Sequence, residues 1–305
     1  MKRISTAVIV RRSFWDRDTL AALKREIQTQ TGLSIGSLLS IDADRKTTKG
    51  RDQGWLTAAL FLAAHTKGGI DACRFRDKCE ASCIDETGMG QSPSVRLARG
   101  NRKKLLVGWP MLFLRLLRIE LALFVRKAER EGLKPAARLN ATTDIEYEKI
   151  APWLFVEFAG VQFYDYTKYP VGERRFPKNY RVTYSWKPSL TEAEQTKILS
   201  EATIAVPFAP ITDTDRVDPL PDSHLGYPVA NGDKDDLIFL HPPGTVIGLE
   251  VKGKGGSRPA WAPGMFAVAK GALPICPNGH EVSGAESTPE PGDLLECAEC
   301  GGEMR

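Results

Sequence analysis

The sequence predicts an α/β fold: a barrel or partial barrel of mainly parallel strands, followed by a small C-terminal zinc ribbon. Two observations predict the sheet. Short apolar runs recur between residues 57 and 252, and segments with helical spacing of apolar residues separate several of them. A third observation predicts the ribbon, since two pairs of metal-ligand residues lie close to the C-terminus. A chain of 305 residues is long enough for one large domain and an appendage.

The chain divides into three regions. Residues 1–34 form a helical lead-in, because Leu20, Leu23 and Ile27 recur at helical spacing and Gly32 is a typical helix stop. Residues 35–268 form the barrel-like domain, which contains a cysteine loop, and residues 271–305 form the zinc ribbon. No internal repeat accompanies this division.

Strands and helices alternate through the central domain. A buried strand over residues 57–64 leads into the cysteine loop, and a helical region over 94–132 follows, with Pro110 at a new first turn. Further helices are expected over 144–158 and from residue 189, where Thr191 and Glu194 form a capping box. The other expected strands cover residues 135–140, 161–166, 180–186, 203–208, 237–240 and 246–252.

In parallel α/β sheets the chemistry gathers beyond the carboxyl ends of the strands. Five polar residues at these ends are the predicted catalytic or substrate-binding groups: Asn140, Asp144, Asp165, Tyr166 and Lys168. Each alone is equally typical of a cap, a turn or a surface ion pair, but their recurrence at successive strand ends predicts a pocket. No G-x-S-x-G, G-x4-G-K-[ST] or H-E-x-x-H motif is present, so the usual hydrolase and nucleotide-binding signatures are absent.

The six cysteines fall into two groups of three. Cys73, Cys79 and Cys83 stand among charged residues in the loop after the first strand. Odd-numbered groups in a reducing compartment favour metal or iron–sulfur ligation over a disulfide framework. Two alternatives remain open: unpaired core thiols, and a structural Zn²⁺ with a fourth ligand such as His65 or Asp71.

The second cysteine group belongs to the predicted ribbon. Cys276 and His280 form a C-x3-H pair, and Cys297 and Cys300 form a C-x2-C pair 16 residues further on. Tetrahedral Zn²⁺ takes four such ligands, and two glycine-containing turns supply them in pairs. Zinc ribbons serve nucleic acids, protein partners or stability alone, so the motif predicts the metal rather than its role.

Charge is distributed unevenly along the chain. Residues 1–130 contain 25 Lys and Arg against 13 Asp and Glu, a net charge of +12, and residues 131–305 contain 17 against 25, a net charge of −8. This asymmetry favours nucleic acid or another anionic ligand as a partner. A solvated helix face is an equally good interpretation. The predicted nucleic-acid-binding residues are Arg96, Arg99, Arg102, Lys103 and Lys104.

The sequence predicts a cytoplasmic chain without membrane association. Its first ten residues lack the apolar run of about 7–15 residues that a signal peptide needs. The most apolar later stretch, residues 105–124, is interrupted by Pro110, Arg115, Arg118 and Glu120, whereas a membrane span needs about 20 nearly uncharged residues.

Several blocks of sequence are distinctive: Phe163-Tyr-Asp-Tyr-Thr-Lys168, Pro135-Ala-Ala-Arg-Leu-Asn140 and Asn231-Gly-Asp-Lys-Asp-Asp236. With them, the chain resembles a family of phage proteins called gene product 88. The resemblance extends over roughly residues 35–268 and includes the cysteine loop. The resemblance implies a phage or prophage origin and an association with phage replication.

The cysteine loop also resembles that of radical S-adenosylmethionine enzymes. Those enzymes carry three cysteines after the first barrel strand, and the resemblance implies a four-iron cluster held by Cys73, Cys79 and Cys83, with S-adenosylmethionine as a further cofactor. The spacing here is C-x5-C-x3-C, whereas the family has C-x3-C-x2-C, and no Gly-Gly-Glu segment is present in the barrel-like domain.

Two functional hypotheses follow. The first is an iron–sulfur enzyme, similar to the radical S-adenosylmethionine enzymes, that acts on nucleic acid or a nucleotide. The alternative is a non-catalytic, zinc-ribbon nucleic-acid-binding protein associated with phage replication.

Overall fold

The computed structural model describes residues 16–41, 48–77, 79, 83, 85, 88–209, 220–234 and 236–250, together with three two-residue strands nearer the C-terminus. The strands are β1 (Leu39–Ile41), β2 (Trp55–Leu60), β3 (Lys134–Arg138), β4 (Gln162–Thr167), β5 (Tyr180–Ser185), β6 (Thr203–Ala209), β7 (Ser223–His224), β8 (Tyr227–Asn231), β9 (Val246–Glu250), β10 (Val268–Ala269), β11 (Leu295–Glu296) and β12 (Glu303–Met304). The α-helices are α1 (Arg17–Thr31), α3 (Pro93–Gly108), α4 (Pro110–Arg130), α5 (Tyr147–Ile150), α6 (Pro152–Glu157) and α7 (Glu192–Glu201).

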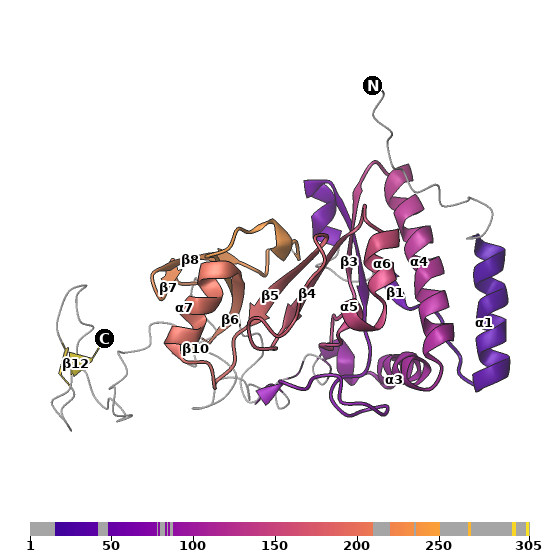
Figure 1. The fold of residues 1–305 in the computed structure, drawn as a ribbon, viewed down its shortest axis with the longest axis horizontal. Coiled ribbons are helices and arrows are strands. Elements are labelled where there is room, and N and C mark those ends of the chain that lie inside the picture. Colours follow the sequence, from indigo (N-terminus) through magenta and orange to yellow (C-terminus); the bar gives the residue numbers. More distant parts are fainter. Residues whose placement is uncertain are drawn as a thin grey trace.

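A mostly parallel sheet forms the centre of the fold (Figure 1). Its strand order is β1-β2-β3-β4-β5-β6-β9-β8-β7, and β10 pairs with the end of β6. The strands from β2 to β6 are parallel neighbours in chain order. Only β1 and β7, at the two ends of this order, pair antiparallel with their neighbours. The prediction of a mainly parallel α/β fold is confirmed, while the described strands include no pairing that closes the sheet into a barrel.

The central strands have buried side chains on both faces of the sheet. Alternate residues of one strand enter different cores: Phe163 of β4 joins the core under the helices, and its neighbour Tyr164 joins a core on the opposite face. Leu237, Ile238 and Phe239 fill this second core. The predicted strand over 237–240 is therefore wrong, since the segment contains the 3₁₀ helix η5 (Ile238–Leu240), which covers the sheet.

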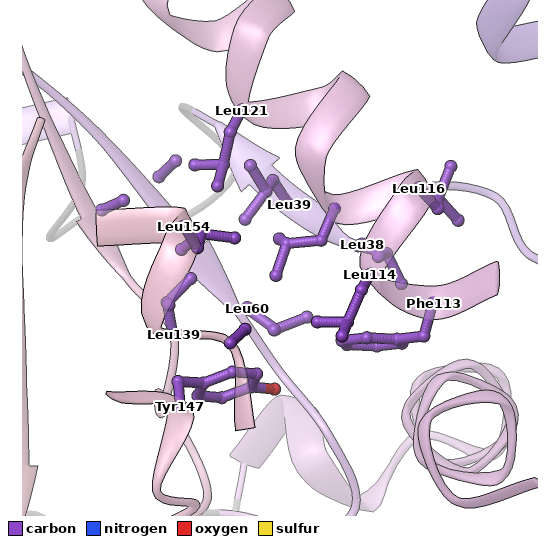
Figure 2. Close-up of a cluster of buried hydrophobic side chains, with 14 of the residues drawn as sticks. Leu38, Leu39, Leu60, Phe113, Leu114, Leu116, Leu121, Leu139, Tyr147 and Leu154 are labelled. Atoms are coloured by element: carbon purple, nitrogen blue, oxygen red, sulfur yellow. The ribbon is translucent and has the colours of Figure 1, made fainter. Parts of the chain in front are cut away.

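Helices α4 and α6 cover one face of the sheet near β3 and β4, and α1 lies alongside α4 (Figure 1). Figure 2 shows how this core is built: Phe113, Leu116 and Leu121 of α4 meet side chains from the first strands. The predicted helix ends are confirmed at Gly32, which caps α1 in the left-handed conformation at φ 70°, and at Pro110, where α4 begins.

Two further corrections concern local structure, and one prediction falls outside the described residues. The helix expected over 144–158 is split into α5 and α6, because Pro152 has no N–H for a continuous helix and instead begins a new one. Strands β7 and β8, which form an antiparallel hairpin, were not predicted. The predicted zinc ligands Cys276, His280, Cys297 and Cys300 lie outside the described residues.

No helix in the described part of the chain is long and apolar enough to cross a lipid bilayer.

One buried carboxylate joins three elements on the helical side. Glu120 of α4 is 6% exposed, and its Oε2 accepts hydrogen bonds from the Leu38 and Leu39 amides and the Ser37 hydroxyl, at 2.8–2.9 Å. The Lys24 ammonium of α1 lies 3.9 Å from Oε1. Burial raises the pKa of Glu120, and these hydrogen bonds oppose the rise. Glu120 thus holds the edge strand β1 and helix α1 against α4.

We expect Glu120→Ala to lower the free energy of unfolding by about 3 kcal/mol, because two buried amides and a hydroxyl lose their acceptor. Urea denaturation measures the change. Glu129→Ala makes the same substitution on an exposed site of the same helix and should change stability by less than about 0.5 kcal/mol. Equal losses in the two variants would contradict the role of Glu120.

Candidate functional site

A cavity of about 130 Å³ lies at the carboxyl ends of β2, β3, β4 and β5. All three cysteines of the loop line it. Of the five predicted strand-end residues, Asn140, Asp144, Tyr166 and Lys168 also line it, and Asp165 lies behind its wall. The remaining lining residues are His65, Arg76, Arg138, Ala141, Thr142, Thr143, Thr167 and Ser185. The predicted pocket at the strand ends is therefore present.

The cysteine loop runs from the end of β2 to the start of α3, and buried charges hold it in place. The Asp85 carboxylate accepts a hydrogen bond from the Ala64 amide at 3.1 Å and pairs with Arg99 of α3 at 2.5 Å. The Asp144 amide donates to the Ala72 carbonyl at 2.7 Å, which joins the loop to the segment after β3. These contacts set the three thiols against the ends of the strands.

Cys83 is buried, and Cys73 and Cys79 are half-buried. Burial raises the pKa of Cys73 and raises that of Cys83 to about 11, and the negative charge of a neighbouring thiolate would raise each further. Backbone amides act in the opposite direction: the Asp85 N–H donates to Cys83 Sγ at 3.5 Å, and the His65 N–H lowers the pKa of Cys73. Without a cation among them, Cys73 and Cys83 are neutral thiols at neutral pH.

Two of the predicted nucleic-acid-binding residues are buried, which corrects that assignment. Arg99 is 8% exposed and pairs with Asp85, and Lys103 is 0% exposed, with its ammonium donating to the His65 carbonyl at 2.6 Å. Arg102 is half-buried and donates to the Ser37 and Phe61 carbonyls. Only Arg96 and Lys104 of the five are exposed. Most of this basic run therefore organises the cysteine loop and its neighbours.

Lys103 brings a buried positive charge close to the thiols. Burial lowers its pKa, while the nearby charges of Cys73, Asp71 and Asp85 raise it. The same attraction acts in reverse, so this ammonium favours negative charge in the cavity.

Asn140 and Asp165 position the backbone at the end of β3. Asp165 is 1% exposed and accepts hydrogen bonds from the Asn140 amide at 2.8 Å, the Leu139 amide at 3.2 Å and the Tyr180 hydroxyl at 2.8 Å. The Asn140 side chain bonds in turn to the Thr143 hydroxyl and to the backbone of Ile145. Because these polar atoms face protein groups, the structure gives both residues a positioning role.

Asp144 belongs to a buried ion-pair network. Its Oδ1 pairs with Arg174 at 2.7 Å, and its Oδ2 accepts from the Thr167 hydroxyl and the Lys168 amide. Arg174 also forms a two-bond pair with Glu148 of α5, at 2.7 and 2.8 Å. The network fixes the segment after β3 against the segment after β4, and Tyr166 and Lys168 line the cavity beside it.

The sequence analysis missed the role of Arg174 and the pairing of Arg138. Arg138 of β3 lines the cavity, pairs with Asp236 at 3.1 Å and stacks over the Tyr166 ring, with 4.8 Å between guanidinium and ring centroid. Asp236 also accepts from the Tyr164 hydroxyl at 3.0 Å. Arg138 lies in the strand predicted over 135–140, which is the signal that could have singled it out, whereas Arg174 gave none.

The thiols do not by themselves form a completed metal site. Within the described residues, no group of three or more His, Cys, Asp or Glu side chains has the arrangement needed to hold a metal ion. The three cysteines line the same cavity. To bind one metal ion or cluster, their sulfur atoms would have to move closer together.

The fold and the cavity define a class of protein: a mostly parallel α/β protein with three cysteines around a cavity at the carboxyl ends of its strands. A family model described as Gene product 88 matches residues 37–263 of the chain. The chain belongs to this family, which confirms the resemblance seen in its sequence blocks. No curated protein and no solved structure shows significant similarity to it.

Asp165 gives the site a pH-dependent contribution to stability. Burial raises its pKa from 3.8 to about 7, so between these values the folded state holds a proton that the unfolded chain has released. Stability contributed by this group is complete below pH 3.8 and is lost as the pH rises to about 7. We expect Asp165→Asn to flatten this fall, as measured by urea denaturation across the range.

The matched control is Asp52→Asn, which removes an exposed carboxylate and should keep the wild-type dependence on pH. An Asp165→Asn profile parallel to that of the wild type would contradict the assignment.

Proposed function

We propose that the chain is a metalloenzyme in which Cys73, Cys79 and Cys83 hold an iron–sulfur cluster at the carboxyl ends of the parallel strands, and that it acts on an anionic substrate such as a nucleotide or nucleic acid. One observation carries the proposal. Three cysteines, spread over eleven residues of one loop, line a single cavity together with polar residues from the ends of β3, β4 and β5.

The donor set suits such a cluster. Thiolates are the usual protein ligands of iron–sulfur clusters, and hydrogen bonds to the ligating sulfurs tune their reduction potential. The Asp85 backbone amide already donates to the sulfur of Cys83. His65 lines the same cavity at 2% exposure, so a fourth protein ligand is available for the alternative of a structural Zn²⁺.

The charges around the cavity also favour an anionic occupant. Arg76, Arg138 and Lys168 line it, of which Arg76 is paired with Asp71 and Arg138 with Asp236, and Lys103 lies buried behind the loop. The one carboxylate among the lining residues, Asp144, is already paired with Arg174. These cations would stabilise the negative charge of three thiolates around iron. They therefore lower the free-energy cost of deprotonating the thiols.

A cluster at this position supplies one-electron redox chemistry to whatever binds beside it. The protein's own groups would orient that molecule: Lys168 offers an ammonium to an anionic group, and Tyr166 offers a hydroxyl and an aromatic face. Three residues hold Tyr166, Lys168 and the cysteine loop in position through their hydrogen bonds and ion pairs: Asn140, Asp144 and Asp165.

We expect protein purified without oxygen to be brown, with broad visible absorption, and to contain iron and acid-labile sulfide. Cys79→Ala should lose the absorption and most of the iron, because one of three ligands is removed. Cys276→Ala is the matched control: it removes a predicted ribbon ligand and should lose zinc while keeping the visible absorption.

Colourless protein that contains only zinc would reject the cluster and favour the structural Zn²⁺. Equal iron content in Cys79→Ala and wild type would place the iron elsewhere. Near-ultraviolet circular dichroism shows whether the variants keep their tertiary structure, so that loss of iron is not loss of fold.

A further inference from the structure

A second pocket of about 220 Å³ lies beside the thiol cavity. The two share Lys168 and Ser185 in their walls, so they adjoin at the ends of β4 and β5. The second pocket continues toward α7, where Lys197 and Ile198 line it. Ligands of parallel α/β proteins bind at this edge of the sheet.

The wall of this pocket combines positive charge with apolar surface. Its three lysines come from different elements: Lys168 follows β4, Lys187 follows β5, and Lys197 belongs to α7. Val171, Leu190 and Ile198 supply the apolar part. Such a wall suits a molecule with an apolar body and a negatively charged group.

The single carboxylate in this wall, Glu194, offsets the charge of one of the three lysines. Glu194 accepts hydrogen bonds from the Thr191 amide at 2.8 Å and the Thr191 hydroxyl at 2.9 Å, and Thr191 receives the Glu194 amide in return. This capping box holds Glu194 at the start of α7. The pocket therefore presents a net positive charge.

The cysteine loop forms part of the surroundings of the second pocket. Asp77 of the loop accepts a hydrogen bond from the Ser189 amide at 3.1 Å. Phe75 packs edge-on against Tyr169, with 4.6 Å between ring centroids, and the Lys187 ammonium lies 5.7 Å from the Phe75 ring centroid. A ligand in the second pocket would thus lie next to the loop that holds the thiols.

We propose that the second pocket binds a small amphipathic anion, with an apolar or aromatic body and a phosphate or carboxylate group, and holds it beside the thiol cavity. Its position next to a metal centre rests on the proposed function, but the binding itself does not. The volume suits a small molecule, and a polymer could enter only by a single residue or end group.

Phenyl phosphate is a suitable probe, benzoate replaces its phosphate by a carboxylate, and benzyl alcohol is the uncharged control. Saturation-transfer NMR on the full chain measures binding. We expect the anions to bind at least about tenfold more tightly than benzyl alcohol, the ratio that one charge-assisted hydrogen bond provides. If both anions bind, the pocket accepts a phosphate or a carboxylate. If phenyl phosphate alone binds, the pocket is specific for phosphate.

The double variant Lys187→Glu/Lys197→Glu should weaken anion binding at least about tenfold. Lys178→Glu makes a matched change of charge at an exposed site before the amino end of β5, and it should leave binding unchanged. Absence of anion binding, equal binding of benzyl alcohol, or equal weakening by Lys178→Glu would each overturn the proposal.

Cys79→Ala separates this proposal from the cluster. Anion binding that survives in this variant, when no iron is present, supports the second pocket even if the cluster proposal fails. Brown wild-type protein that does not bind phenyl phosphate would leave the cluster proposal standing and reject this one.

Discussion

The parallel run of strands from β2 to β6 is the constraint on which the rest of the structure depends. Because these strands are neighbours in chain order and all point the same way, each of their carboxyl ends reaches the same edge of the sheet. The cysteine loop after β2, the Asn140–Asp144 segment after β3 and Lys168 after β4 meet there for that reason. The cavity and the second pocket are both products of this arrangement.

Buried charges convert this shared edge into a fixed site. Arg99 with Asp85 joins α3 to the cysteine loop, and Arg174 with Asp144 joins the segments after β4 and β3. Breaking one member of such a pair leaves an uncompensated buried charge, which typically costs about 3–5 kcal/mol. Most charged residues near the cavity are therefore positioning groups. The thiols, Tyr166 and Lys168 are the groups on which chemistry could act.

Regular features of the sequence predicted much of this, and tertiary contacts decided the rest. The parallel sheet, the capping box at Thr191 and the meeting of the cysteines with strand-end residues follow from periodicity and spacing.

The burial of Arg99 and Lys103 does not follow from the sequence, because a basic run on a helix looks the same whether it faces solvent or a buried carboxylate. The apolar run over 237–240 predicts a strand where the structure has a 3₁₀ helix, because a four-residue apolar run carries no period of its own. Arg174 gave no signal, since its partners lie 26 and 30 residues away in sequence.

The central claim is that the three thiols of one loop share a single iron–sulfur centre, with substrate bound beside it. The most direct measurement is an anomalous difference map from crystals grown without oxygen, recorded on both sides of the iron absorption edge. The account predicts iron density inside the cavity, within bonding distance of Cys73, Cys79 and Cys83. Iron density elsewhere in the molecule, or zinc density at these three sulfurs, would contradict it.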